Sequence, residues 1–116
     1  MKSIINGKII LKDRVIEGMA LLYSDVIEGI VSADAIPADA EIYDAQGLYT
    51  APGLVDIHCH AGDCHWFNQE PLEAAKHHLS HGTTSILATL YFDTPKAELL
   101  KQTALVQSAM REPFGA

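Results

Sequence analysis

The feature that most constrains the fold is an abrupt change of pattern at Pro52-Gly53. Before this point, short apolar runs are separated by turn residues, and no sustained helical period is present. After it, strand-like runs alternate with helix-like periods, an order that favours parallel strands connected by helices. The sequence therefore predicts an α/β chain with two unlike parts, residues 1–51 and residues 52–116.

The first part predicts a small β domain. Residues 2–11 are rich in isoleucine and are interrupted by Asn6-Gly7, a pair typical of a type I′ hairpin turn. Residues 32–40 are small, acidic and contain Pro37, so we expect a loop there. Further strands are expected over residues 18–23, 26–31, 41–45 and 48–51. We interpret this part as an antiparallel unit that forms part of a small β-sandwich domain.

The second part predicts the order strand, helix, strand, helix. The strands are expected over residues 54–60 and, as a buried strand, over residues 83–90. A first helix fits residues 71–81 and stops at Gly82, and a second begins with Thr94 as N-cap and Pro95 at its first position. The expected apolar stripes are Leu72, Ala75 and Leu79 on the first helix and Leu99, Leu100, Ala104, Leu105 and Ala109 on the second.

Two strand–helix units are too few to cover both faces of their strands. A closed barrel of eight such units typically has about 250 residues. We therefore expect the first two βα units of an incomplete (β/α)8 TIM barrel, as an N-terminal fragment of a longer enzyme. Residues 113–116 carry no signal for the end of a domain, which agrees with this expectation.

Composition narrows the class of protein. The chain has 116 residues and a net charge of −7, with acidic residues in both parts and no basic patch. This charge argues against a nucleic-acid or anionic-membrane partner. Neither a bilayer-spanning run nor a signal peptide is evident, and only two cysteines are present, so we expect a cytoplasmic protein in a reducing compartment.

The candidate chemistry lies in His58 and His60. On a strand, residues i and i+2 point to the same side, about 6.6 Å apart, so these two imidazoles are expected to share a face. Two imidazoles on one strand can bind one divalent metal ion, and a site at the carboxyl end of a strand is typical of barrel enzymes. Asp56 is expected behind them, filling the barrel interior or orienting a ligand, and Val55, Ile57 and Cys59 are expected on the opposite face, against helices.

Two segments resemble known enzymes. Residues 51–60, Ala-Pro-Gly-Leu-Val-Asp-Ile-His-Cys-His, resemble the signature that closes the first barrel strand of the amidohydrolase superfamily. Residues 81–90, His-Gly-Thr-Thr-Ser-Ile-Leu-Ala-Thr-Leu, resemble a stretch of the N-acetylglucosamine-6-phosphate deacetylases, although Ala88 stands where that family has proline. The loop after His60 also lacks the family's usual glycine-rich run. The resemblance covers the whole chain and is strongest over residues 51–100.

The resemblance implies a metal-dependent amide hydrolase that converts N-acetylglucosamine 6-phosphate to glucosamine 6-phosphate and acetate. His58 and His60 match the metal pair of this family, with zinc as the foremost metal and iron, manganese or cobalt as alternatives. The catalytic aspartate and the remaining ligands are expected on later strands, so the chain alone is expected to be inactive. Its substrate-binding residues are unassigned, and the full-length enzyme is expected to be a homo-oligomer that binds a small amino-sugar phosphate.

Two alternatives stay open. A dihydroorotase- or hydantoinase-like cyclic amidase uses the same His-x-His pair, so the metal strand does not separate it from a sugar deacetylase. The other alternative is a non-catalytic fragment or interaction module, because two histidines leave a zinc ion two ligands short.

The other reactive residues are expected to have structural roles. His65 is interpreted as an exposed loop residue, and Cys59 as a packing residue. Trp66-Phe67 is expected to fix the loop on the first helix in preference to lining a pocket mouth. Surface or packing roles are expected for His77, His78 and His81, strand formation for Thr83, Thr84 and Ser85, and no zinc motif for Cys64, whose spacing from Cys59 is not that of a zinc site.

Overall fold

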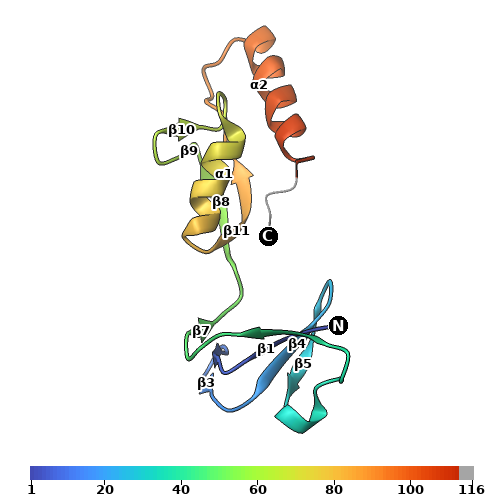
Figure 1. The fold of residues 1–116 in the computed structure, drawn as a ribbon. Helices are drawn as coiled ribbons and strands as arrows, with labels where there is room; N and C mark the ends of the chain where they lie inside the picture. Colours follow the sequence, from blue (N-terminus) through green and yellow to red (C-terminus); the bar gives the residue numbers. More distant parts are fainter. Residues whose placement is uncertain (113–116) are drawn as a thin grey trace. The chain divides into compact units, whose positions relative to one another are not determined.

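A computed structural model describes residues 1–112, which fall into two compact units (Figure 1). The first unit is Met1–Pro52, and the second begins at Gly53, where the sequence pattern changes. Residues 113–116, for which the sequence shows no domain end, lie outside the described residues. Within residues 1–112, no helix is long and apolar enough to cross a membrane.

The first unit contains two small sheets of mixed direction. One sheet has the strand order β5-β4-β1-β6 and the other the order β3-β2-β7. The pairs β1/β6 and β2/β7 are parallel, so the expectation of a purely antiparallel unit is wrong. The elements are β1 (Lys2–Ile5), β2 (Lys8–Ile10), β3 (Val15–Ile16), β4 (Ala20–Tyr23), β5 (Ile27–Val31), the 3-10 helix η1 (Ala33–Ala35), β6 (Glu41–Asp44) and β7 (Tyr49–Thr50).

The predicted hairpin at Asn6-Gly7 is also wrong. Asn6 has a φ of 55°, but Gly7 lacks the positive φ that the second position of a type I′ turn requires. Strands β1 and β2 instead enter different sheets, because the later segment supplies their partners. The backbone N–H of Gly47 donates to the Asn6 carbonyl at 2.7 Å, and that of Lys8 donates to the Leu48 carbonyl at 2.9 Å. Pairing with a segment distant in sequence thus replaces the local hairpin.

The core of the first unit is small. Its fully covered side chains come from alternate positions of short strands, as expected where one sheet face is packed. They are Ser3, Ile9, Ala20 and Leu22. Val26, Ile27, Leu48 and Tyr49 are exposed apolar residues of the same unit.

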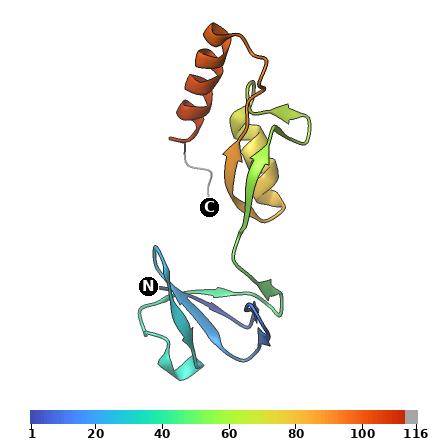
Figure 2. The same cartoon turned by 180° about the vertical axis from the view of Figure 1, so that it is seen from behind.

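The second unit is a parallel βαβ arrangement followed by a second helix. Strand β8 (Leu54–Cys59) pairs in parallel with β11 (Thr83–Ala88), and the helix α1 (Pro71–Ser80) connects them (Figure 2). A short hairpin of β9 (Ala61–Gly62) and β10 (His65–Trp66) precedes α1, and α2 (Lys96–Ala109) ends the described part. The order strand, helix, strand, helix is therefore confirmed for residues 53–112.

The helix ends illustrate local sequence control. Helix α1 begins with Pro71 and is followed by Gly82 at a φ of 89°, the left-handed conformation that glycine adopts without strain. Helix α2 begins one residue later than predicted. Pro95 is its N-cap, with a φ of −55° and a ψ of 143°, so Thr94 does not cap it.

The packing of the second unit is one-sided. Ala74 of α1 is fully buried against the backbone of Gly62, and a cavity of about 200 Å³ lies between apolar residues of α1, β11 and α2. The predicted burial of β11, of one face of β8 and of the apolar stripe of α2 is wrong. A sheet of only two strands leaves much of their surface uncovered. Leu87 of the predicted buried strand is 65% exposed. Val55 and Ile57, expected against helices, are exposed as well, as are Leu99, Leu100, Ala104 and Leu105 of the predicted α2 stripe.

Candidate metal centre

The carboxyl end of β8 is shaped by a bulge. Ile86 of β11 pairs with Asp56, and Ala88 pairs with Cys59, so β8 uses one residue more than its partner over this stretch. A bulge interrupts the strict alternation of side chains along a strand. The side chains of Asp56 and Cys59 therefore need not point to opposite faces of the sheet, as positions three apart on a regular strand do. Burial raises the pKa of the Cys59 thiol, and the negative charge of Asp56 and a hydrogen bond with it raise that pKa further.

His58 and His60 lie together at this strand end. Their ring centroids are 5.1 Å apart and their planes are nearly perpendicular, at 81°. His60 immediately follows the last residue of β8. Asp56 accepts the backbone N–H of His58 at 3.0 Å, so this carboxylate holds the bulged backbone and not an imidazole ring. A short piece of hydrogen-bonded backbone thus holds the two rings close to each other. Their binding of a metal stays a prediction.

Tyr91 is a residue of this site that sequence reasoning missed. Its ring stacks on His60 with a centroid distance of 4.6 Å and an angle of 16°. The ring centroid of Trp66, in β10, lies 5.7 Å from the ring centroid of Tyr91. Its place in the sequence could have indicated it, because Tyr91 follows β11 and His60 follows β8. The carboxyl ends of these two parallel strands lie at the same edge of the sheet. The Nδ1 atom of His60 is buried and has no hydrogen-bond partner among the described residues.

The Trp66-Phe67 pair divides into two roles. Phe67 is 3% exposed and its ring stacks near His78, so it fixes the loop on α1 as predicted. Trp66 is 39% exposed, and its ring centroid lies 5.7 Å from that of Tyr91, so it does not share the buried position of Phe67.

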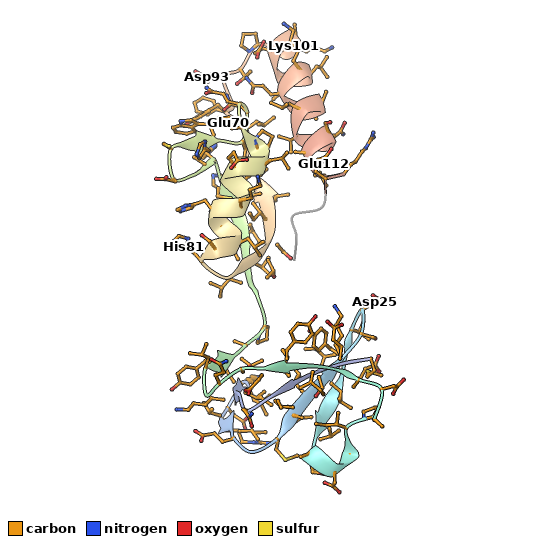
Figure 3. The ribbon with its side chains drawn as sticks, in the orientation of Figure 1. Asp25, Glu70, His81, Asp93, Lys101 and Glu112 are labelled. Atoms are coloured by element: carbon orange, nitrogen blue, oxygen red, sulfur yellow. The ribbon has the colours of Figure 1, made fainter. Side chains whose placement is uncertain are left out.

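The remaining predicted residues are spread over the hairpin and α1. His65 forms an ion pair with Glu70, which is labelled in Figure 3, with 2.9 Å between Nδ1 and Oε2. This hydrogen bond raises the pKa of His65. His78 donates its Nε2 proton to the Ala61 carbonyl at 3.0 Å, which is a packing role. The thiol of Cys64 is exposed and unpaired with Cys59, and the Thr84 side chain packs over the backbone of Gly53.

The donors fit part of a metal site. The two imidazoles, one of which has a buried ring nitrogen without a hydrogen-bond partner, suit a divalent transition metal. Neutral imidazole nitrogen is a common ligand for such ions. Among residues 1–112, no group of three or more His, Cys, Asp or Glu side chains is arranged to hold a metal ion. Since a zinc site has four ligands, the histidine pair can account for only two of them.

Comparison with known proteins adds independent information. No known family profile matches the chain. The dihydroorotase of Ruminiclostridium cellulolyticum is 35% identical over 78 residues, covering 67% of this chain and 18% of that protein. The dihydroorotase of Pyrococcus furiosus is 30% identical over 84% of this chain, and the adenine deaminase of Thermosipho africanus is 40% identical over 58% of it.

A solved structure shares the fold. N-acetylglucosamine-6-phosphate deacetylase from Pasteurella multocida superposes with a TM-score of 0.72 and 20% identity over 98% of this chain and 31% of that structure. This chain spans about a fifth of the length of the first dihydroorotase, the aligned part being 18% of it. These likenesses in sequence and in fold confirm the resemblance and identify the chain as similar to part of an amidohydrolase-superfamily enzyme.

Proposed function

We propose that this chain supplies the first metal-binding strand of a metal-dependent amidohydrolase. The observation that carries the proposal is the pair of imidazoles, 5.1 Å apart at the carboxyl end of β8. The pair lies in a segment whose sequence resembles the amidohydrolase signature, and the relatives of the chain include a dihydroorotase and an adenine deaminase. The general activity of metal-dependent hydrolysis is therefore the best-supported function.

In this proposal, His58 and His60 are metal ligands, and zinc is the foremost metal. A bound divalent ion polarises a carbonyl and lowers the pKa of a coordinated water towards about 7. The contribution of this chain is to hold two neutral imidazoles in place. The bulge fixed by Asp56 positions the backbone of His58, and the stacked ring of Tyr91 limits rotation of His60.

The proposed fold is the beginning of a TIM barrel. Strands β8 and β11 are parallel and connected by a helix, as consecutive barrel strands are. Both strands expose large apolar side chains, among them Leu54, Val55, Ile57 and Leu87, which further strands and helices of a longer protein would cover. The exposed apolar residues of the first unit support the companion proposal that residues 1–51 are part of a β-sandwich completed by other strands.

The proposed substrate is N-acetylglucosamine 6-phosphate, cleaved to glucosamine 6-phosphate and acetate in amino-sugar breakdown. The structural neighbour and the resemblance of residues 81–90 support this choice. We further propose a cytoplasmic, homo-oligomeric full-length enzyme that acts on this small molecule and has no nucleic-acid or membrane partner, in keeping with the net charge of −7.

A cyclic amidase is the second candidate. The specific observation that favours it is that three of the relatives are dihydroorotases, one of them aligned over 84% of this chain. The adenine deaminase relative similarly points to substrates with a nitrogen-containing ring. The same His-x-His pair would serve a sugar deacetylase and a cyclic amidase, and the two differ in the substrate that they hydrolyse.

The test uses the complete polypeptide that contains this segment. We expect acetate release from N-acetylglucosamine 6-phosphate, abolished by a chelator and restored by zinc, with His58→Asn and His60→Asn each lowering kcat at least a hundredfold. Ring opening of dihydroorotate without acetate release would favour the cyclic amidase. Hydrolysis that neither chelation nor these substitutions affect would overturn the assignment.

A non-catalytic role is tested with the same material. If the complete polypeptide retains no metal after purification and hydrolyses neither substrate, the interaction-module alternative is supported.

A further inference from the structure

We propose a second transition-metal site, distinct from the β8 pair, at the carboxyl end of α1, with His77 and His81 as its ligands. The two rings have a centroid distance of 4.5 Å and are tilted by 39°. They are residues i and i+4, which lie on one face of a helix one turn apart. Pairs of histidines with this spacing are established zinc ligands in helical motifs.

The hydrogen bonds of His81 prepare it as a ligand. Its Nδ1 lies 2.9 Å from the backbone carbonyl of His77. A carbonyl oxygen only accepts hydrogen bonds, so Nδ1 carries the ring proton. The Ser80 hydroxyl, 3.0 Å from the same nitrogen, donates its own proton to the His77 carbonyl and therefore also accepts from Nδ1. Nε2 of the neutral imidazole then keeps a free lone pair. Metal-bound histidines typically have this arrangement, in which the nitrogen away from the metal donates to a carbonyl and fixes the ring.

The geometry suits one small cation. Two Zn–N bonds of about 2.1 Å at a tetrahedral angle place the two nitrogens about 3.4 Å apart. The ring centroids are 4.5 Å apart, so both side chains lie within reach of one ion. Ring nitrogens also select late first-row ions such as zinc, nickel and copper over magnesium and calcium.

The surroundings favour a cation over other ligands. The negative end of the helix dipole lies at the carboxyl end of α1, where His81 is the C-cap (Figure 3). His81 is exposed and His77 is partly exposed, so an ion can reach both. The neighbouring His78 is packed elsewhere, because its Nε2 donates to the Ala61 carbonyl and its ring stacks on Phe67. Its centroid is 6.2 Å from that of His77, against 4.5 Å for His81. With two protein ligands, the remaining coordination positions are open to water.

The test is a zinc titration of the untagged chain carrying His58→Gln and His60→Gln, which removes the β8 pair. We expect one zinc per chain by calorimetry, and at least a tenfold loss of affinity on adding His77→Gln or His81→Gln. His65→Gln, an exposed histidine outside the pair, is the matched control and should leave the affinity unchanged. Zinc should also raise the thermal midpoint of the chain, because an ion bound only to the folded state stabilises it.

A second measurement avoids dependence on the variants. In the unsubstituted chain, NMR spectra recorded during a zinc titration should show changes in the ring signals of both His77 and His81. No binding in the double variant together with no change of these ring signals would overturn the proposal. Equal affinity with and without His81 would overturn it as well.

Discussion

At the scale of single residues, the candidate site depends on how each imidazole is held. The nearness of His58 and His60 was predicted because it joins two positions only two apart in the chain. Their rings lie 5.1 Å apart although a bulge interrupts the alternation of β8 and His60 follows its last residue. The contact between His60 and Tyr91 was not predictable in the same way. It joins residues 31 positions apart and depends on where β11 ends relative to β8, which only the pairing of the two strands determines.

The first residue-scale prediction concerns Tyr91. Replacing Tyr91 by Leu removes the ring stacked on His60 and should weaken zinc binding at the β8 pair about fivefold, since an aromatic pair contributes about 1 kcal/mol. Tyr91→Phe keeps the ring and should bind zinc as the parent does. The measurement is a zinc titration in a His81→Gln background, so that only the β8 pair is observed.

The outcomes of this experiment separate two questions. Absence of zinc binding in the parent would count against the proposed metal pair itself. Binding in the parent with equal affinity in Tyr91→Leu would leave the pair intact and show that stacking does not position His60.

The second residue-scale prediction concerns pH. The hydrogen bond that His65 donates to the Glu70 carboxylate raises the pKa of His65 above its ordinary value of 6.5. A raised pKa in the folded chain gives a stabilisation that is fully present below about 6.5 and is lost as the pH rises through the folded-state pKa. Glu70→Gln should therefore lower the thermal midpoint at pH 5.5 but have little effect at pH 9.

An NMR titration of the His65 ring checks the same interaction directly. The pKa of His65 should fall when Glu70 is replaced by Gln. A pKa that is the same in both proteins would show that the ion pair is not formed in solution.

At the scale of elements, the ends of helix α1 could be predicted from the sequence, but the pairing of strands could not. The start of α1 at Pro71 and its stop before Gly82 were predicted because both depend on the backbone preferences of one or two residues. The hairpin at Asn6-Gly7 was wrong, although its signal is strong, because strands from residues 41–50 compete for the same edges and pair in parallel. The bulge in β8 likewise arises from the register with β11, so no pattern within β8 indicates it.

The element-scale prediction tests the contact between the β9–β10 hairpin and α1. A methyl group on Gly62 would overlap the backbone carbonyl of the fully buried Ala74, and helix backbone does not move easily. Gly62→Ala should therefore destabilise the second unit by about 1–3 kcal/mol. The single tryptophan, Trp66, lies in this unit, so its fluorescence during urea unfolding reports the change.

Cys64→Ala is the matched control for this substitution. Cys64 is exposed, lies in the turn of the same hairpin and forms a long hydrogen bond, of 4.0 Å, with Asp63. Its replacement should therefore change stability by less than about 0.5 kcal/mol. If Gly62→Ala unfolds at the same urea concentration as the control, the hairpin does not pack on α1 as described.

At the scale of the whole molecule, burial was the property least accessible from the sequence. The apolar runs of residues 54–57 and 83–90 have the composition of strands covered on both faces, and this composition led to the expectation of a buried strand. Burial depends on which other elements are present, and in the described chain β8 and β11 have only each other as strand neighbours. The apolar pattern therefore predicts the burial that these strands would have in a larger fold. The matched relatives are several times as long as this chain.

This reasoning leads to a prediction about the 116-residue chain in solution. Ile57 and Leu87 are 74% and 65% exposed on the strand pair, and exposed apolar patches of this kind promote association. The chain should bind a hydrophobic dye such as ANS and form oligomers in sedimentation experiments as its concentration rises. Combined Ile57→Thr and Leu87→Thr substitutions should reduce both effects, while Val26→Thr, equally exposed but in the first unit, should reduce them less. A chain that stays monomeric and binds no dye at high concentration would contradict the open strand pair, and with it the proposal that further strands complete this sheet.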